Sequence, residues 1–179
     1  MMLSMVGWGI GNPIGDIAVE FIDPVSVFVI ELISGLLLFF VAALVLPSLR
    51  SAIKQVPWKI AIPFGLIQPG LAYLFGNIGW QYGTVTTGAI LMSSEVIFLA
   101  IGGALFLREK LNLWSVVALL IGVTGAIIVG IAGQSSNPET SGQFVTILGM
   151  SVSAGLVGAI AFLGVGLAGA IYGLLMRRL

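Results

Sequence analysis

The sequence lacks cysteine and histidine altogether, and it contains little charge. No Cys and no His occur among its 179 residues, and charged residues make up only 8% of them. The missing cysteine excludes disulfide bonds and thiol nucleophiles. The missing histidine removes the commonest zinc ligand and the usual general base of enzymes. We therefore expect no metal site, no cofactor and no enzymatic activity.

Apolar residues, by contrast, are abundant. They make up 59% of the chain, with 8% charged, whereas soluble domains average about 45–50% apolar and about 25% charged residues. A soluble fold of this size could not bury so much apolar surface, so we expect the surplus to face lipid. The net charge is zero, which gives no reason to expect a nucleic-acid partner. The composition predicts a multi-pass protein of the cell (inner or plasma) membrane.

Six apolar segments are long enough to cross a bilayer, for which a helix needs about 20 residues. The first is the weakest, because Asn12, Pro13, Asp16 and Glu20 interrupt it. The last is longer than one crossing requires, so Phe144–Met150 is a candidate surface segment. The sequence predicts an all-α membrane protein with transmembrane helices at Leu3–Ile22, Val25–Leu46, Trp58–Asn77, Thr84–Leu107, Leu113–Ala132 and Ile147–Met176.

The basic residues all fall where one side of a membrane would hold them. Positive charge gathers in cytoplasmic loops. With the basic clusters inside, the six spans alternate consistently, and both the N-terminus and the C-terminus are cytoplasmic. Trp80 falls near a predicted membrane boundary, where an aromatic belt would explain it. The basic residues are Arg50, Lys54, Lys59, Arg108, Lys110, Arg177 and Arg178.

Two of the predicted spans carry distinctive packing and kinking residues. In the third span, Pro63 and Pro69 flank Gln68, and a proline kinks a helix because it removes a backbone hydrogen bond. Such a kink is either plain geometry or, as in many transporters, a mark of the substrate site near the midplane. In the fifth span, small residues share one face, which predicts either tight packing against a neighbouring helix or a dimer seam or sliding surface. These small residues are Ala118, Gly122, Ala126 and Gly130.

The stretch from Ala72 to Leu111 contains a series of short motifs. It holds an Ala-Tyr pair, a Tyr before a small polar turn, a Ser-rich helix with a Glu and a Phe, and a Leu-x-Glu-x-Leu turn. These are Ala72-Tyr73, Tyr82, Ser93-Ser94-Glu95, Phe98 and Leu107-Arg108-Glu109-Lys110-Leu111. Their order and spacing resemble the EamA-type repeat of the drug/metabolite transporter superfamily. Trp8-Gly9, Asn12, Glu20 and Asp23-Pro24 look like the first-helix signature of that family, and Val116–Gly130 is similar to its glycine-punctuated fifth helix.

Three positions depart from the family pattern. Arg108 stands where the family usually has glycine before the turn glutamate, and Val96 replaces a frequent proline. Glu31 stands where many relatives carry a basic residue in the second helix. The resemblance therefore implies a transporter fold but no particular class of substrate.

The resemblance also implies a domain organisation. It covers residues 3–133, which correspond to one five-helix repeat. Because five is odd, a second repeat would enter the membrane inverted. Residues 134–142 would then be an outer loop, and residues 143–179 the first helix of a second, truncated repeat. Either the sequence is part of a longer transporter, or the chain pairs as a homodimer to complete a pathway.

Two acidic residues inside the predicted spans are candidates for binding a proton or a substrate. A charge at the bilayer centre costs about 2.5–3.5 kcal/mol, so such residues face the bundle interior or a wet cavity. Glu95 lies about 16 Å into the fourth span, near the midplane, and Glu31 lies nearer the outer leaflet. Each either exchanges a proton or meets a cationic substrate, or is a protonated acid bonded to a neighbouring helix. As acids without a basic partner, both are expected to be protonated, hydrated or bonded to hydroxyls such as Ser93, Ser94 or Tyr73.

Polar and aromatic residues on other spans are candidates to line the same cavity. Each either contacts a substrate or forms a hydrogen bond between helices. Asp16 is interpreted as a residue near the outer water, and Glu109 as the partner of a turn ion pair or a helix cap between Arg108 and Lys110. The candidate lining residues are Asn12, Gln68, Tyr73 and Asn77.

The resulting hypothesis is a membrane transporter that moves a small metabolite by alternating access through a cavity between the first four helices. The sequence contains no nucleotide-binding loop, so we expect an ion gradient or substrate exchange to drive transport. The alternative is a non-transporting membrane scaffold or accessory subunit that assembles with a partner. Glu95 argues against the scaffold, which has no use for an acid at the midplane.

Overall fold

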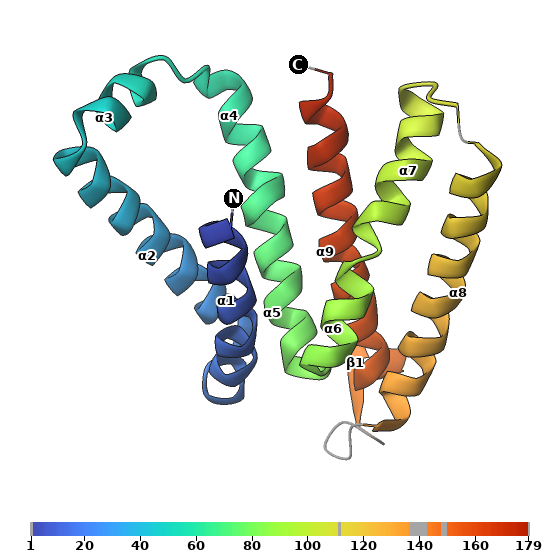
Figure 1. Cartoon of the computed structure of the whole chain (residues 1–179). Coiled ribbons are helices and arrows are strands. Elements are labelled where there is room, and N and C mark those ends of the chain that lie inside the picture. Colours follow the sequence, from blue (N-terminus) through green and yellow to red (C-terminus); the bar gives the residue numbers. More distant parts are fainter. Residues whose placement is uncertain (1, 111, 137–142, 148–149, 179) are drawn as a thin grey trace.

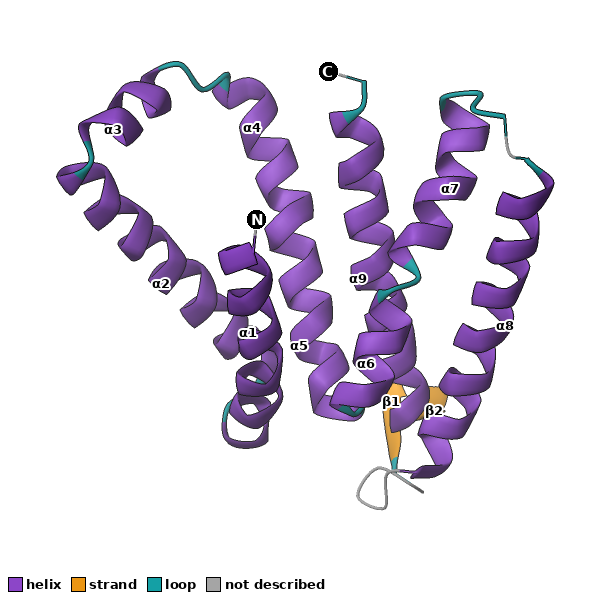
Figure 2. Ribbon diagram, viewed as in Figure 1, coloured by secondary structure: helices purple, strands orange, loops and turns teal. Residues whose placement is uncertain are grey.

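The computed structural model describes residues 2–110, 112–136, 143–147 and 150–178, and the side chains at 2–8, 12, 85, 129–136 and 147 lie outside the described part. Long helices run back and forth between two ends of the molecule (Figures 1 and 2). The elements are α1 (Met2–Phe21), α2 (Pro24–Val45), α3 (Pro47–Lys54), α4 (Trp58–Gly65), the π-helix η1 (Leu66–Leu71), α5 (Ala72–Tyr82), α6 (Val85–Met92), α7 (Glu95–Phe106), α8 (Leu113–Ser136), β1 (Phe144–Ile147), β2 (Met150–Ser153) and α9 (Ala154–Met176).

The second predicted span appears as α2, which begins at the Asp23-Pro24 turn. The Asp23 carboxylate accepts hydrogen bonds from the backbone N–H groups of Val25 at 3.1 Å and Ser26 at 3.0 Å. It thereby satisfies donors that the first turn of a helix leaves free. Hydrogen bonds from Ser26, first through its side chain and then through its backbone, lower the pKa of Asp23. Pro24 follows at the first helical position, where the missing N–H is harmless.

The third predicted span is interrupted where the prolines predict a kink. Gln68 has non-helical backbone angles, with φ −137° and ψ 112°, because the ring of the following proline disfavours the helical region. The helix passes through η1 at this point and continues as α5 to Tyr82, five residues beyond the predicted end at Asn77. The kink is confirmed, and the span is longer than the sequence predicts.

The fourth predicted span consists of two helices, where the sequence predicts one. The side chain of Thr84 caps α6 by accepting from the Thr87 N–H at 3.2 Å. The helix ends at Met92 because Ser93 Oγ donates to the Ile90 carbonyl at 2.6 Å, a bond that competes with the helical ladder and bends the helix. Glu95 is therefore the first residue of α7 rather than the interior of a continuous helix.

The end of the chain differs most from the prediction. The residues predicted to begin the sixth helix form an antiparallel hairpin instead, with Phe144 opposite Ser153 and Ile147 opposite Met150. The hairpin leads directly into α9, which begins at Ala154. Further upstream, α8 continues to Ser136, past its predicted end at Ala132. The rest of the predicted outer loop, residues 137–142, lies outside the described residues.

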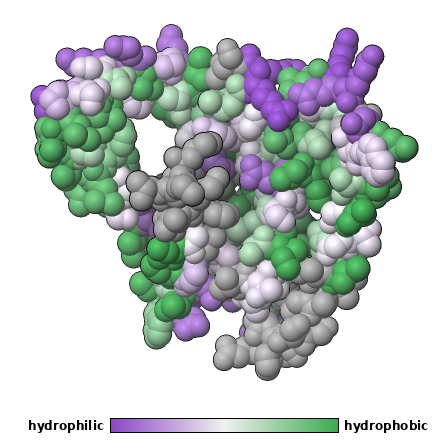
Figure 3. Space-filling view, viewed as in Figure 1, coloured by the Kyte–Doolittle hydropathy of each residue, from purple (hydrophilic) through white to green (hydrophobic). Residues whose placement is uncertain are grey.

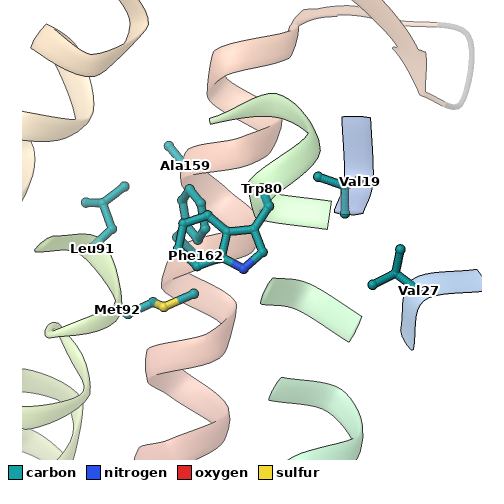
Figure 4. Packing of buried hydrophobic residues seen from close by; sticks show 7 residues of the cluster. All are labelled: Val19, Val27, Trp80, Leu91, Met92, Ala159 and Phe162. Atoms are coloured by element: carbon teal, nitrogen blue, oxygen red, sulfur yellow. The ribbon is translucent and has the colours of Figure 1, made fainter. Parts of the chain in front are cut away.

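The core forms around α9, which runs through the middle of the molecule beside α5, α6 and α7 (Figure 1). Phe162 of α9 is fully buried and meets the ring of Trp80 edge-to-face, with centroids 4.6 Å apart. These two rings belong to a buried hydrophobic cluster (Figure 4), whose other members are Val19, Val27, Leu91, Met92 and Ala159. Gly79 lies so close that an added Cβ would stand 2.5 Å from the Phe162 ring, so glycine is what lets α5 and α9 approach.

Apolar side chains cover the outside of this bundle. Among the described residues, three helical segments are long and apolar enough to span a membrane, namely Pro24–Val45, Thr86–Phe106 and Ala154–Met176, and the described part of α8, Leu113–Ile128, is a shorter apolar segment. Large apolar residues of α2 such as Leu36 and Leu38 are about 70% exposed, as expected where lipid is the solvent. Hydrophobic residues cover the flanks in Figure 3, and hydrophilic ones gather at one end. The chain is a multi-pass membrane protein.

Candidate functional site

A cavity of about 670 Å³ lies between α1, α2, α5 and the α6–α7 break, with α9 at its back. Five of the six predicted site residues line it. The sixth, Asn12, belongs to α1, and its side chain lies outside the described part. The structure thus brings most of the predicted residues to one place, while their role in binding stays a prediction. The five are Glu31, Gln68, Tyr73, Asn77 and Glu95.

Glu31 is held in the cavity by a hydrogen bond between helices. The amide Nδ2 of Asn77 on α5 donates to Glu31 Oε2 on α2 at 2.8 Å. Asn77 is buried and Glu31 is half-buried, so little water competes with this bond. The bonded partner on the neighbouring helix is thus an amide rather than a hydroxyl. The bond fixes the carboxylate relative to α5 and leaves it at the cavity wall.

Glu95 lies at the α6–α7 break, against a notch of two glycines on α9. A Cβ added at Gly169 would stand 2.6 Å from the Glu95 carboxyl carbon, and one added at Gly166 would stand 2.7 Å from Ser94 Oγ. The two glycines therefore let the broken helix and its acid pack directly on the α9 backbone. Within the described part of the chain, Ser93 and Ser94 form no hydrogen bond with the Glu95 carboxylate, so neither serine hydroxyl is its partner.

Gln68 contributes an unpaired acceptor to the cavity wall. Its Oε1 is buried and has no hydrogen-bond partner among the described residues. A buried acceptor without a partner is costly, by about 1–3 kcal/mol, and such atoms usually bind water or a ligand. The carboxylates of Glu31 and Glu95 make the polar part of the cavity rich in acceptors. This arrangement suits a ligand that brings donors, such as an amine or another cation.

The sequence did not reveal the apolar wall of the cavity. Trp80, interpreted from the sequence as a boundary residue, is 6% exposed and lines the cavity together with Met92 and Val165. The aromatic-belt interpretation of Trp80 is wrong. A signal was available, since Tyr73, Asn77 and Trp80 are spaced four and three residues apart and so share one face of α5. Val165 had no such signal, since it is one apolar residue among many in the last predicted span.

A salt bridge lies at the end of the molecule that holds the C-terminus. Glu109 pairs with Arg177 at 3.1 Å rather than with its neighbours Arg108 and Lys110. Both side chains are about half exposed, so the pair itself contributes about 0–1 kcal/mol. Next to it, Arg178 Nη2 donates to the Phe106 carbonyl at 3.1 Å. These contacts tie the end of α9 to the end of α7.

A bundle of apolar helices around a polar, acid-lined cavity is the architecture of a membrane transport protein. The model of the EamA-like transporter family matches residues 1–131, which is most of the chain. The chain belongs to the EamA-like transporter family, and the resemblance noted in its motifs is confirmed.

Two curated relatives carry similar sequences. A protein of Archaeoglobus fulgidus described as an uncharacterized transporter is 24% identical over 129 residues, which cover 72% of this chain and 45% of the relative. The uncharacterized transporter YvbV of Bacillus subtilis is 26% identical over 150 residues, covering 83% of this chain and 48% of the relative. The chain thus spans about half the length of the curated relatives it matches. No solved structure matches the chain significantly.

Proposed function

We propose that this chain is a substrate-binding unit of a membrane transporter and moves a small metabolite through the cavity between α1, α2, α5 and the α6–α7 break. The observation that carries the proposal is the meeting of Glu31, Gln68 and Glu95 in one cavity of about 670 Å³. Family membership and the transporter names of the two relatives support it. The acceptor-rich lining favours a metabolite that carries a positive charge or several donors.

Alternating access is the mechanism we propose, and two broken helices support it. One break lies at Gln68 in η1 and the other at Ser93-Ser94 between α6 and α7. Both breaks border the cavity, as the discontinuous helices of many transporters border theirs. Residues at such breaks can absorb changes in backbone angles while the helices on either side move as rigid bodies. Proton or cation exchange at Glu95, or substrate exchange, would drive the cycle.

We further propose six transmembrane helices with both termini in the cytoplasm. The chain runs out and back between the two ends in the order α1, α2, α4–η1–α5, α6–α7, α8 and α9 (Figure 1). Residues 3–133 would form one five-helix repeat and residues 143–179 the start of a second. A complete transport path would then need a second repeat, supplied by a longer chain or by a second copy in a homodimer.

The test is the substitution Glu95→Gln, which removes the titratable proton and keeps the size of the side chain. A panel of amines, neutral polar compounds and carboxylates is first screened for thermal stabilisation of the purified protein. The best compound is then used for uptake into proteoliposomes over a range of pH. We expect Glu95→Gln to reduce uptake at least about tenfold and to flatten its pH dependence.

The matched control is Glu20→Gln, the same change at an exposed residue of α1 outside the cavity. It should leave both the rate and the pH dependence as they are in the wild type. Unchanged uptake and pH dependence in Glu95→Gln would refute the coupling role of this acid. Folded protein that binds and moves no member of the panel would favour the scaffold alternative.

A further inference from the structure

A second cavity, also of about 670 Å³, lies on the other side of the α6–α7 break, between α7 and α8. We call it the α7–α8 groove. One wall is formed by Val96, Ile97, Leu99 and Ala100 of α7, and the other by the face of α8 that carries Ala118, Gly122, Gly125 and Ala126.

The spacing of the small residues of α8 predicts close packing against a neighbouring backbone. The structure does not show such packing at Gly122. A Cβ added at Gly125 would meet nothing within 4 Å, and one added at Gly122 would meet the side chain of Ile97 alone, at 3.3 Å. This face of α8 is therefore open, and it gives the groove its depth. The expectation of a close neighbouring backbone is therefore wrong at Gly122 within the described chain. An open apolar surface in the middle of a membrane must be covered by something apolar.

Basic residues adjoin the end of the groove that Glu109 and Arg177 line, which we call its mouth. Glu109 and Arg177 line the mouth and neutralise each other through their salt bridge. Arg108 and Lys110 flank Glu109 in the same turn, and Arg178 follows Arg177. Both Arg108 and Lys110 are exposed. The mouth therefore carries excess positive charge next to an apolar slot.

The depth of the groove corresponds to one leaflet of the bilayer. Along α8 its lining extends from Ser115 to Ala126, which is about 16 Å at 1.5 Å per residue. The hydrocarbon core of a bilayer is about 30 Å thick, so one leaflet accounts for half of that. At its inner end the groove reaches Ser93 and Ser94 and adjoins an almost wholly apolar cavity of about 370 Å³, which shares Ile97 and Ala126 with it.

We propose that the α7–α8 groove binds an anionic phospholipid from the leaflet at the basic end, with an acyl chain in the groove and the phosphate beside Arg108 and Lys110. An apolar slot one leaflet deep matches an acyl chain, and the excess positive charge at its mouth matches an anionic headgroup. The acyl chain of a zwitterionic lipid would fill the slot equally well, but its headgroup would gain less electrostatic binding energy from the basic residues at the mouth. This site does not depend on the function proposed for the substrate cavity.

The experiment measures lipid binding to the full chain by native mass spectrometry. The protein is released from detergent in the presence of phosphatidylglycerol or of phosphatidylcholine with the same acyl chains. Neutralising a basic residue near the membrane surface weakens binding about fivefold. The double variant Arg108→Gln/Lys110→Gln should therefore bind phosphatidylglycerol about 25-fold more weakly and lose its preference over phosphatidylcholine. Its matched control, Arg50→Gln/Lys54→Gln, makes the same change of charge in α3, far from the groove, and should bind like the wild type.

A second variant tests the groove itself. Gly125→Leu fills the open slot without changing any charge, and should reduce binding of phosphatidylglycerol at least tenfold. Gly35→Leu on α2, where an added Cβ also meets nothing within 4 Å, is its control. Equal binding of the two lipids by the wild type, or equal loss in the α3 control, would overturn the proposal. Unchanged binding in Gly125→Leu would also overturn the proposal, because the lipid preference would then come from surface charge alone.

Discussion

At the scale of single residues, the two glycines of the α9 notch differ in what they approach. A Cβ at Gly169 would meet the carboxyl group of Glu95, the mobile end of a flexible side chain. A Cβ at Gly166 would meet the Glu95 backbone nitrogen at 2.9 Å and the Met92 carbonyl oxygen at 3.2 Å. Backbone atoms at a helix break cannot move aside without shifting both helices. The same added methyl group should therefore have different effects at the two positions.

We predict that Gly166→Ala destabilises the protein by about 1–3 kcal/mol, as overpacking does in well-packed cores. Gly169→Ala should change stability by less than about 1 kcal/mol, because the carboxylate can rotate away. It should nevertheless alter the pH dependence of uptake, since the displaced group is Glu95. Unfolding in mixed detergent measures the first effect, and proteoliposome uptake measures the second. Equal destabilisation by both variants would contradict this description of the notch.

Arg108 is the residue with a strained backbone. Its φ is 56°, in the left-handed region that costs a side chain about 1–2 kcal/mol. The turn is fixed by the N–H groups of Leu107 and Glu109, which donate to the Gly103 carbonyl at 3.0 and 3.1 Å. The glycine that the family usually has here would adopt this conformation without strain.

We predict that Arg108→Gly stabilises the protein by about 0.5–1 kcal/mol. The variant relieves the backbone strain of the folded state, but glycine also increases the conformational entropy of the unfolded chain, which offsets part of the gain. Thermal unfolding in detergent at several pH values measures the change. Arg108→Ala is the control, because it removes the same charge and keeps the Cβ that causes the strain. If both variants gained equally, charge rather than backbone strain would be the cause.

At the scale of elements, the cap of α2 makes a pH-dependent contribution to stability. The pKa of Asp23 is lowered in the folded state, first by the hydrogen bond from the Ser26 side chain and then by those from the backbone. A carboxylate with a lowered pKa stabilises the fold above its unfolded pKa of about 3.9. That contribution is lost as the pH falls through the folded pKa, where the carboxylate is protonated.

We predict that the wild type loses stability relative to Asp23→Asn when the pH falls below about 4. Asparagine caps a helix about as well as aspartate but does not titrate, and every other acid is common to both proteins. The measurement is the difference between their unfolding temperatures over pH. A difference that stays constant through the acidic range would mean that the cap does not depend on charge.

The helices could be predicted from the sequence where one local signal dominates, and not where tertiary contacts decide. The Asp23-Pro24 turn and the proline kink at Gln68 were predictable, because each has a single backbone cause. The break at Ser93-Ser94 was missed, since serine within an apolar run usually remains helical. The hairpin from Phe144 to Ser153 was missed because a short apolar segment has no periodicity that separates strand from helix.

The candidate site was predictable to a similar degree. Glu31, Asn77 and Glu95 stood out because polar groups within apolar spans have few explanations. Their actual contacts, with an amide and with a glycine notch, follow from how α2 and α9 pack against α5 and α7. Contacts of this kind depend on which helices become neighbours in the fold. No local sequence pattern specifies those neighbours.

At the scale of the whole molecule, zero net charge conceals a strong separation of charge. The basic residues all lie in or next to α3, the start of α4, the α7–α8 connection and the end of α9. These segments share one end of the bundle (Figures 1 and 3). Glu109 is the one acid in these segments, and the remaining acids are distributed elsewhere along the sequence. From this separation we predict a preferred orientation in the membrane, with the basic end toward the cytoplasm.

The separation predicts which residues share a face of the membrane, and the absence of native cysteine makes the test direct. In single-cysteine variants, Arg50→Cys and Arg108→Cys should resist a membrane-impermeant maleimide added to intact cells, and should react once the membrane is permeabilised. Ser151→Cys lies in the hairpin at the opposite end and should react without permeabilisation. Reaction of Arg50→Cys and Arg108→Cys from opposite faces would refute the crossing of α4–α5 and α6–α7 as two successive spans. Because the cavity lies between these segments, that result would also leave Glu31 and Glu95 without a common path across the bilayer.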